Sequence, residues 1–156
     1  MNKLISLISL ATLCVLLFVT SCRPKNSGNA VSGDAASKTY VAPGKYDEFY
    51  NFVSGGFSGQ MSVYGLPSGR LLKVIPVFSV DPEKGWGYSE ETKPMLNTSH
   101  GIVPWDDLHH VQLSKTDGNY DGKWAFGNAN NTPRVARIDL KTFRTAEIIE
   151  LPNSAG

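Results

Sequence analysis

The sequence predicts an all-β fold, and three observations support that prediction. Aromatic and β-branched residues recur in short runs, which Gly, Pro, Asn and Asp interrupt at intervals typical of turns. After residue 44, no stretch shows a convincing helical period of apolar residues. Two segments, 62–75 and 136–149, share the order strand, tight turn, arginine, strand, with Arg70 and Arg144 in matching places. We therefore expect antiparallel strands joined by short turns.

Five segments carry the strand pattern most clearly. They are 60–64, 70–80, 123–126, 134–140 and 144–151. Pro76 indicates that the second of these lies at a sheet edge or contains a bulge, because proline cannot donate to a strand ladder. The segment 45–52 is compatible with one turn of helix.

The repeated hairpin favours a partial β-propeller. A propeller repeats one blade around a ring, and a blade cannot bury both of its faces alone. The chain would then hold the first one or two blades of a larger ring, with residues 81–107 as a Trp-, Gly- and Pro-rich insertion. The alternative is a generic pair of hairpins in another kind of β domain.

The N-terminus has the features of a secretory signal. Lys3 precedes an uncharged apolar run, 4–19, that is too short for a membrane span and ends in small residues. The residues before Cys22 resemble a bacterial lipobox, so we expect a lipoprotein-type signal peptide over 1–21 and a lipid on Cys22. Ordinary signal cleavage near Ser21 is the alternative.

Composition sets the remaining boundaries. Residues 22–44 are rich in Ser, Gly, Ala, Asn and Pro, which predicts a flexible, disordered linker, and 45–156 is expected to form the folded part. The net charge of +1 gives no indication of nucleic-acid binding. Cys14 would leave with the signal, so neither a disulfide nor a cysteine metal site is expected in this stretch.

The adjacent pair His109 and His110 is the most informative chemical feature. Imidazole is the commonest protein ligand for copper, zinc and iron, although an adjacent pair can also be an ordinary loop feature. The third histidine, His100, is interpreted as a loop residue.

Other motifs give weaker signals. Residues 117–122 match the first positions of a calcium-binding EF-hand loop, but Asn128 stands where the loop needs glutamate, so a turn is the better interpretation. The glycine-rich segment 54–59 matches neither phosphate-binding fingerprint and is interpreted as a strained turn. No Gly-x-Ser-x-Gly elbow of a hydrolase occurs.

Over roughly residues 45–151, the order and spacing of several motifs resemble the N-terminal region of nitrous oxide reductase. The matching segments are 54–60, 63–68, 70–81, 85–87, 107–110, 114–123 and 131–140. No twin-arginine pair precedes the apolar run, so the resemblance is to the Sec-exported branch. Val111 departs from the better-known branch, which has proline after the histidine pair.

The resemblance implies a seven-bladed propeller with a four-copper, sulfide-bridged centre, followed by a cupredoxin domain with a two-copper centre. Seven histidines hold the copper–sulfide centre, and His109 and His110 match two of them. Both reach one cluster only from a loop or bulge, because adjacent side chains on a regular strand point to opposite faces. Asp107 is placed to accept a hydrogen bond from a ligand ring.

The same resemblance implies reduction of N₂O to N₂ and water in denitrification. It implies a periplasmic electron donor such as a c-type cytochrome, a homodimer, and possible calcium elsewhere in the full-length protein. This chain would be an inactive N-terminal part of that enzyme. Two alternatives stay open: a lipid-anchored, exported β-propeller binding module without redox activity, and an exported single domain with a simple metal site at His109 and His110.

Overall fold

The computed structural model describes residues 32–152, which fall into two units that meet between Ala36 and Ser37. Helix α2, Ser32–Thr39, spans this boundary and lies within the range predicted to be a flexible linker. Ala35 and Ala36 favour helix, and Lys38 in the last turn complements the helix dipole. The predicted signal peptide and Cys22 lie outside the described residues. Within residues 32–152, no helix has the length and apolar character needed to cross a membrane.

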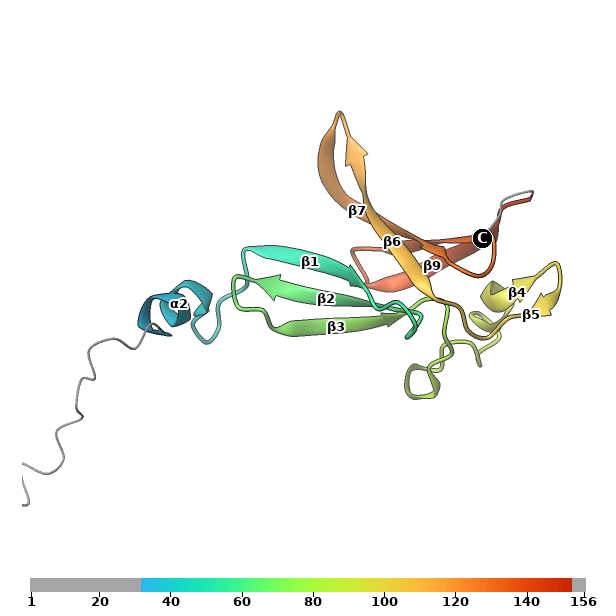
Figure 1. The fold of residues 1–156 in the computed structure, drawn as a ribbon, viewed down its shortest axis with the longest axis horizontal. Coiled ribbons are helices and arrows are strands. Elements are labelled where there is room, and N and C mark those ends of the chain that lie inside the picture. Colours follow the sequence, from blue (N-terminus) through green and yellow to red (C-terminus); the bar gives the residue numbers. More distant parts are fainter. Residues whose placement is uncertain (1–31, 153–156) are drawn as a thin grey trace, which may run out of the picture. The chain divides into compact units, whose positions relative to one another are not determined.

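The second unit is built from antiparallel sheets (Figure 1). A three-stranded sheet has the order β1-β2-β3, with strands Phe49–Ser54, Gln60–Leu66 and Leu71–Pro76. A four-stranded sheet has the order β6-β7-β8-β9, with strands Leu108–Thr116, Asn119–Ala129, Arg134–Asp139 and Arg144–Glu150. The all-β prediction is confirmed.

The segment between the two sheets contains short elements only. It carries the 3₁₀ helices η1 and η2, at Pro82–Lys84 and Lys93–Leu96, and the strand pair β4 and β5, at Asn97–Thr98 and Gly101–Ile102. Asp81 caps η1 by accepting a hydrogen bond from the Lys84 backbone N–H. This segment matches the insertion predicted over 81–107.

Both predicted hairpins are present, as β2–β3 and β8–β9, and Pro76 ends β3 at the edge of its sheet. The turn of helix expected over 45–52 is wrong. That region enters β1, which pairs with β2 from Phe49↔Leu66 to Ser54↔Met61, so the ladder satisfies its backbone groups. Strand β7 extends well beyond the predicted 123–126, and β6 carried no sequence prediction.

The core lies between the inward faces of the two sheets. Buried and partly exposed residues alternate along β2 and β8, the pattern expected when a strand buries one face. The buried cluster comprises Met61, Val63, Ile75, Val77, Phe78, Leu108, Ala125, Ala129, Ala136 and Ile138. Burying each large apolar side chain of this cluster contributes roughly 1.5–3 kcal/mol.

The sheets stack as neighbouring propeller blades do. Strand β1 lies beside β6 and β3 beside β9, so equivalent edges of the two sheets face each other. Apolar side chains remain exposed on both sheets, among them Phe49, Leu71 and Ile149. Within the described residues, each outermost strand has a neighbouring strand on one side only, apart from a single bridge between Gly56 and Leu108 of β6. Two antiparallel sheets that do not close into a barrel confirm the predicted partial β-propeller.

Candidate functional site

His109 and His110 lie in a β-bulge near the start of β6. Leu108 pairs with Ala129 and Val111 pairs with Gly127, so three steps along β6 face two steps along β7. The extra residue interrupts the ladder where the histidines lie. The prediction that the pair occupies a loop or bulge is confirmed. Gly127 contributes to this arrangement, because a Cβ there would lie 2.6 Å from Leu108 Cδ1.

The bulge brings the two imidazoles together. Their ring centroids are 5.3 Å apart with an interplanar angle of 81°, an edge-to-face contact. Consecutive side chains on a regular strand diverge to opposite faces, which would prevent such an approach. The His109 side chain is 42% exposed and His110 is exposed, so both rings are accessible to a metal ion.

Asp107 lies beside this pair and is nearly buried. Its Oδ2 is 3.5 Å from His109 Nε2, close enough for electrostatic attraction but beyond a good hydrogen-bond length. Its Oδ1 is buried, has no hydrogen-bond partner within residues 32–152, and faces Gly56, where a Cβ would approach it to 3.5 Å. The predicted place of Asp107 next to a histidine agrees with the structure, while its role as an acceptor stays a prediction.

The glycine-rich segment 54–59 supports the histidine site from β1–β2. Gly56 has a positive φ of 55°, and its carbonyl accepts a 3.1 Å hydrogen bond from Leu108 N. Next to it, the Trp105 indole donates a 2.6 Å hydrogen bond to the Phe57 carbonyl. The interpretation of this segment as a turn is confirmed, and the turn contacts the chain just before the histidines.

The other candidate sites are turns. His100 lies in the β4–β5 turn, where its N–H donates to Thr98 Oγ1, which confirms it as a loop residue. The calcium-like segment forms the β6–β7 turn, with positive φ at Asp117 and Gly118. Its Asp121 carboxylate accepts hydrogen bonds from Ser114, Thr116 and Lys123, which favours the turn interpretation. Residues 32–152 contain no group of three His, Cys, Asp or Glu side chains placed to hold a metal ion.

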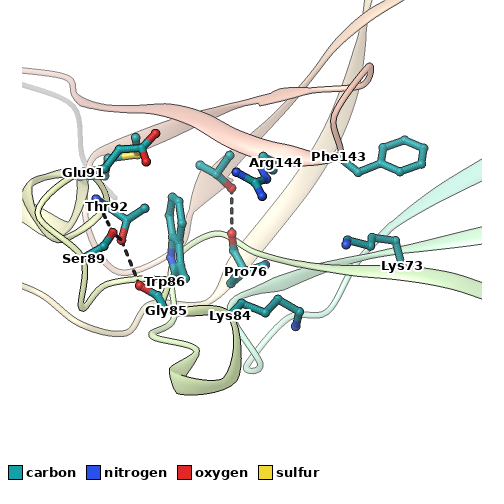
Figure 2. A pocket seen from close by; sticks show the side chains of 12 residues that line it. Lys73, Pro76, Lys84, Gly85, Trp86, Ser89, Glu91, Thr92, Phe143 and Arg144 are labelled. Carbon is teal, nitrogen blue, oxygen red and sulfur yellow. Dashed lines mark hydrogen bonds between the residues drawn. The ribbon is translucent and has the colours of Figure 1, made fainter.

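A cavity of about 480 Å³ lies away from the histidines (Figure 2). It opens between β3, β9 and the segment with η1 and η2, and Trp86 forms part of its wall. Lys73, Lys84 and Arg144 also line it, but Lys84 is already paired with Asp81 at 2.6 Å and Glu91 adds a negative charge. The cavity therefore shows no defined preference for a charged ligand.

Sequence reasoning missed two buried charged residues beside the site. Asp106 and Arg134 are both fully buried and form an ion pair, with 3.3 Å between Oδ2 and the guanidinium. Burial raises the pKa of Asp106, but hydrogen bonds from Thr132, Asn131 and Arg134 outweigh it and hold that pKa below its ordinary value. An available signal was that Arg134 occupies an inward position in the alternation of 134–140.

Comparison with known proteins agrees with this geometry. No protein-family model matches the chain. The chain is 44% identical to the nitrous-oxide reductase of Pseudomonas fluorescens over 129 residues, covering 83% of this chain and 20% of that protein. The chain is related to the nitrous-oxide reductases. The Stutzerimonas stutzeri nitrous-oxide reductase is 42% identical over 77% of this chain and 19% of its own length.

A third nitrous-oxide reductase, from Ralstonia nicotianae, is 37% identical over 94% of this chain and 25% of its own length. The chain thus spans about a fifth to a quarter of the length of these nitrous-oxide reductases. The matched part includes most of the described residues. The resemblance inferred from the motif order is therefore confirmed.

Proposed function

We propose that this chain is the N-terminal part of the propeller of a nitrous-oxide reductase, and that the full-length protein reduces N₂O. The reaction consumes two electrons and two protons and yields N₂ and water. Homology to nitrous-oxide reductases over most of the chain supports this proposal. The described residues supply one part of the site, so the chain alone is expected to be inactive.

The bulge at His109 and His110 is the observation that carries the proposal. It places two imidazoles side by side, and imidazole ligands hold copper without adding charge. Two imidazoles cannot hold four copper ions and a sulfide, so the other ligands would come from elsewhere in the full-length protein. The half-exposed surface of the pair is compatible with that requirement.

When bound, a copper–sulfide centre would supply electrons to N₂O and polarise its oxygen. This chain's own residues would hold and orient that centre. His109 and His110 would bind copper through their ring nitrogens, and the nearby carboxylate of Asp107 would orient His109. The buried Oδ1 of Asp107, which has no partner in the described residues, fits a site that is completed by other groups.

The proposal extends to the parts of the enzyme outside this chain. A cupredoxin domain with a two-copper centre would pass electrons from a periplasmic donor such as a c-type cytochrome. A homodimer and a calcium site elsewhere are included as the resemblance implies. The open strand edges of both sheets support incompleteness. Residues 1–156 alone should be aggregated or unfold with poor cooperativity, and a monomeric two-state unit at micromolar concentration would contradict this.

We also propose export to the periplasm and lipid attachment at Cys22. The apolar run 4–19 and the small residues before Cys22 support it. Acyl chains contribute about 0.8 kcal/mol per buried CH₂, so several chains anchor a protein stably. Radiolabelled fatty acid should label the exported protein, and Cys22→Ala should abolish the label. Equal labelling of both proteins would exclude this anchor.

The copper assignment is tested in the full-length protein. His109→Ala and His110→Ala should lose the visible absorption of the copper–sulfide centre and N₂O consumption, because each removes a ligand. The two-copper centre should keep its own spectrum. Asp107→Asn should lower copper affinity or activity by about 10–100-fold.

His100→Ala is the matched control, because His100 lies in the β4–β5 turn and should leave copper content unchanged. Full copper content and turnover in both His109→Ala and His110→Ala would refute the assignment. A full-length wild-type protein that consumes no N₂O would instead favour the binding module without redox activity.

A further inference from the structure

The connection that leads into the histidine bulge is held by one buried carboxylate. Asp106 is fully buried, and its two oxygens accept five hydrogen bonds. Oδ1 accepts from the backbone N–H of Asp107 at 2.8 Å and from two nitrogens of Asn131, each at 2.9 Å. Oδ2 accepts from Thr132 Oγ1 at 2.6 Å and from the Arg134 guanidinium at 3.3 Å.

Arg134, the charged partner of Asp106, also makes several contacts of its own. Its Nε donates to Thr132 Oγ1 at 2.7 Å, and a second guanidinium nitrogen donates to the Val103 carbonyl at 3.3 Å. The guanidinium also lies over the Phe78 ring, 5.1 Å from its centroid. The network therefore ties residues 103–107 to the β7–β8 connection.

These contacts reach the histidines through the backbone. Asp106 fixes the N–H of Asp107, and the Asp107 carbonyl accepts a 2.9 Å hydrogen bond from Asn130 N. The next N–H, of Leu108, donates to Gly56. Residues 106–108 are thus held from the β7–β8 connection and from the β1–β2 turn, directly before the bulge.

A buried ion pair is a poor device for stability alone, because desolvating two charges cancels much of their attraction. In some proteins such a pair serves instead to fix one conformation. We propose that Asp106, with Arg134, is a positioning residue that sets the placement of His109 and His110 for metal binding. This inference rests on the proposed function and adds a residue to which the resemblance assigns no role.

The test uses the copper-loaded full-length protein. Asp106→Asn leaves Arg134 without its carboxylate, and Thr132→Val removes one hydrogen bond from each partner with less risk to folding. Asp121→Asn is the matched control, because Asp121 also accepts several hydrogen bonds but lies at the far end of the β6–β7 hairpin. The measurements are copper per protein, the visible spectrum per copper, kcat and KM for N₂O, and the unfolding midpoint.

We expect Asp106→Asn to lower copper retention or kcat about 10–100-fold, as loss of a ligand-orienting partner does, and to shift the visible spectrum. Thr132→Val should show the same change more weakly, and it carries the test if Asp106→Asn does not fold. Asp121→Asn should change the unfolding midpoint only. The double variant Asp106→Asn with Arg134→Gln removes both charges. Relative to Asp106→Asn alone, it should recover more of the unfolding midpoint than of the copper spectrum.

An unchanged spectrum and kcat per copper in Asp106→Asn and Thr132→Val, with only the unfolding midpoint lowered, would overturn the inference. His109→Ala, measured in parallel, separates this failure from failure of the proposed function. If His109→Ala and His110→Ala both keep the copper signal and turnover, the copper assignment of the proposed function is wrong. If His109→Ala loses the signal while the Asp106 and Thr132 variants keep it, only the positioning role is wrong.

Discussion

An Asp–Arg ion pair lies beside each of the two sheets. The two pairs differ in the exposure of the arginine side chain, which the length of the contact does not show. Beside the three-stranded sheet, Asp47 before β1 meets Arg70 of the β2–β3 turn at 2.8 Å, and the Arg70 side chain is 51% exposed whereas that of Asp47 is 1% exposed. In the four-stranded sheet, Asp106 meets Arg134 at 3.3 Å, and both side chains are fully buried. Loss of the longer contact, Asp106–Arg134, should lower the free energy of unfolding more than loss of the shorter one. Water cannot reach the buried site to replace the missing partner.

The exposure of the arginine, and not the remaining hydrogen-bond donors, separates the two pairs. Without Arg70, Asp47 would still accept hydrogen bonds from the backbone N–H and hydroxyl of Ser68. Without Arg134, Asp106 would likewise keep neutral donors only, but in a place where both side chains of the pair are fully buried. The first pair fastens a surface turn, whereas the second belongs to the framework beside the histidine bulge.

The largest effect is expected when the buried pair Asp106–Arg134 is broken. Arg134→Met should destabilise the full-length apo-protein by about 3–5 kcal/mol, the usual cost of leaving a buried charge uncompensated. Arg70→Met is the matched variant and should cost far less, because that guanidinium is half exposed. Urea denaturation of both variants checks the comparison. Equal shifts of the unfolding midpoint would show that burial does not separate the two pairs.

The second effect compares two glycines with the same backbone conformation. Gly59 has φ of 64° and Gly69 has φ of 70°. Alanine at either position pays about 1–2 kcal/mol for left-handed backbone. At Gly59 the new Cβ would also lie 2.8 Å from the Asp106 carbonyl oxygen, whereas nothing lies within 4 Å at Gly69.

Gly59→Ala should therefore lower the thermal unfolding midpoint clearly more than Gly69→Ala. It should also reduce copper binding, because it pushes on the connection before the histidines. A smaller effect at Gly59 than at Gly69 would contradict the close packing of the two segments.

A third, smaller effect concerns pH. Asp106 has a folded-state pKa below the ordinary value of 3.8. Its contribution to stability is therefore present above about pH 4 and is lost as the pH falls through the folded-state pKa. Asp106→Asn should flatten the rise of unfolding free energy with pH in this acid range. An unchanged pH dependence, measured by denaturant titration, would exclude Asp106 as a contributor.

The smallest effect is expected at a surface pair on β8 and β9. Arg137 and Glu147 lie 3.2 Å apart with side chains 41% and 50% exposed. Such pairs contribute about 0–1 kcal/mol and are screened by salt. Glu147→Gln should change the unfolding midpoint by no more than this, with the difference vanishing in high salt. A loss as large as that of Arg134→Met would contradict the ranking by burial.

The sequence by itself determined where most strands and turns lie. The alternation over 60–64 and 134–140 reflects the two-residue period of a strand that buries one face, and the turn residues bound the hairpins. Motif order also related the chain to nitrous-oxide reductases, while the choice of His109 and His110 as metal ligands stays a prediction. These properties depend on local residue type and spacing, which a single chain displays directly.

Only the tertiary structure decided how the site is assembled. Strand β6 has mixed polar residues and little alternation, so its pairing with β7 defines it. The bulge is a mismatch between two strands and cannot be recognised in either one alone. The Asp106–Arg134 contact joins residues that are distant in sequence. The alternation of 134–140 is compatible with an inward Arg134, but its partner is set by packing, so no local pattern predicts that this partner is Asp106.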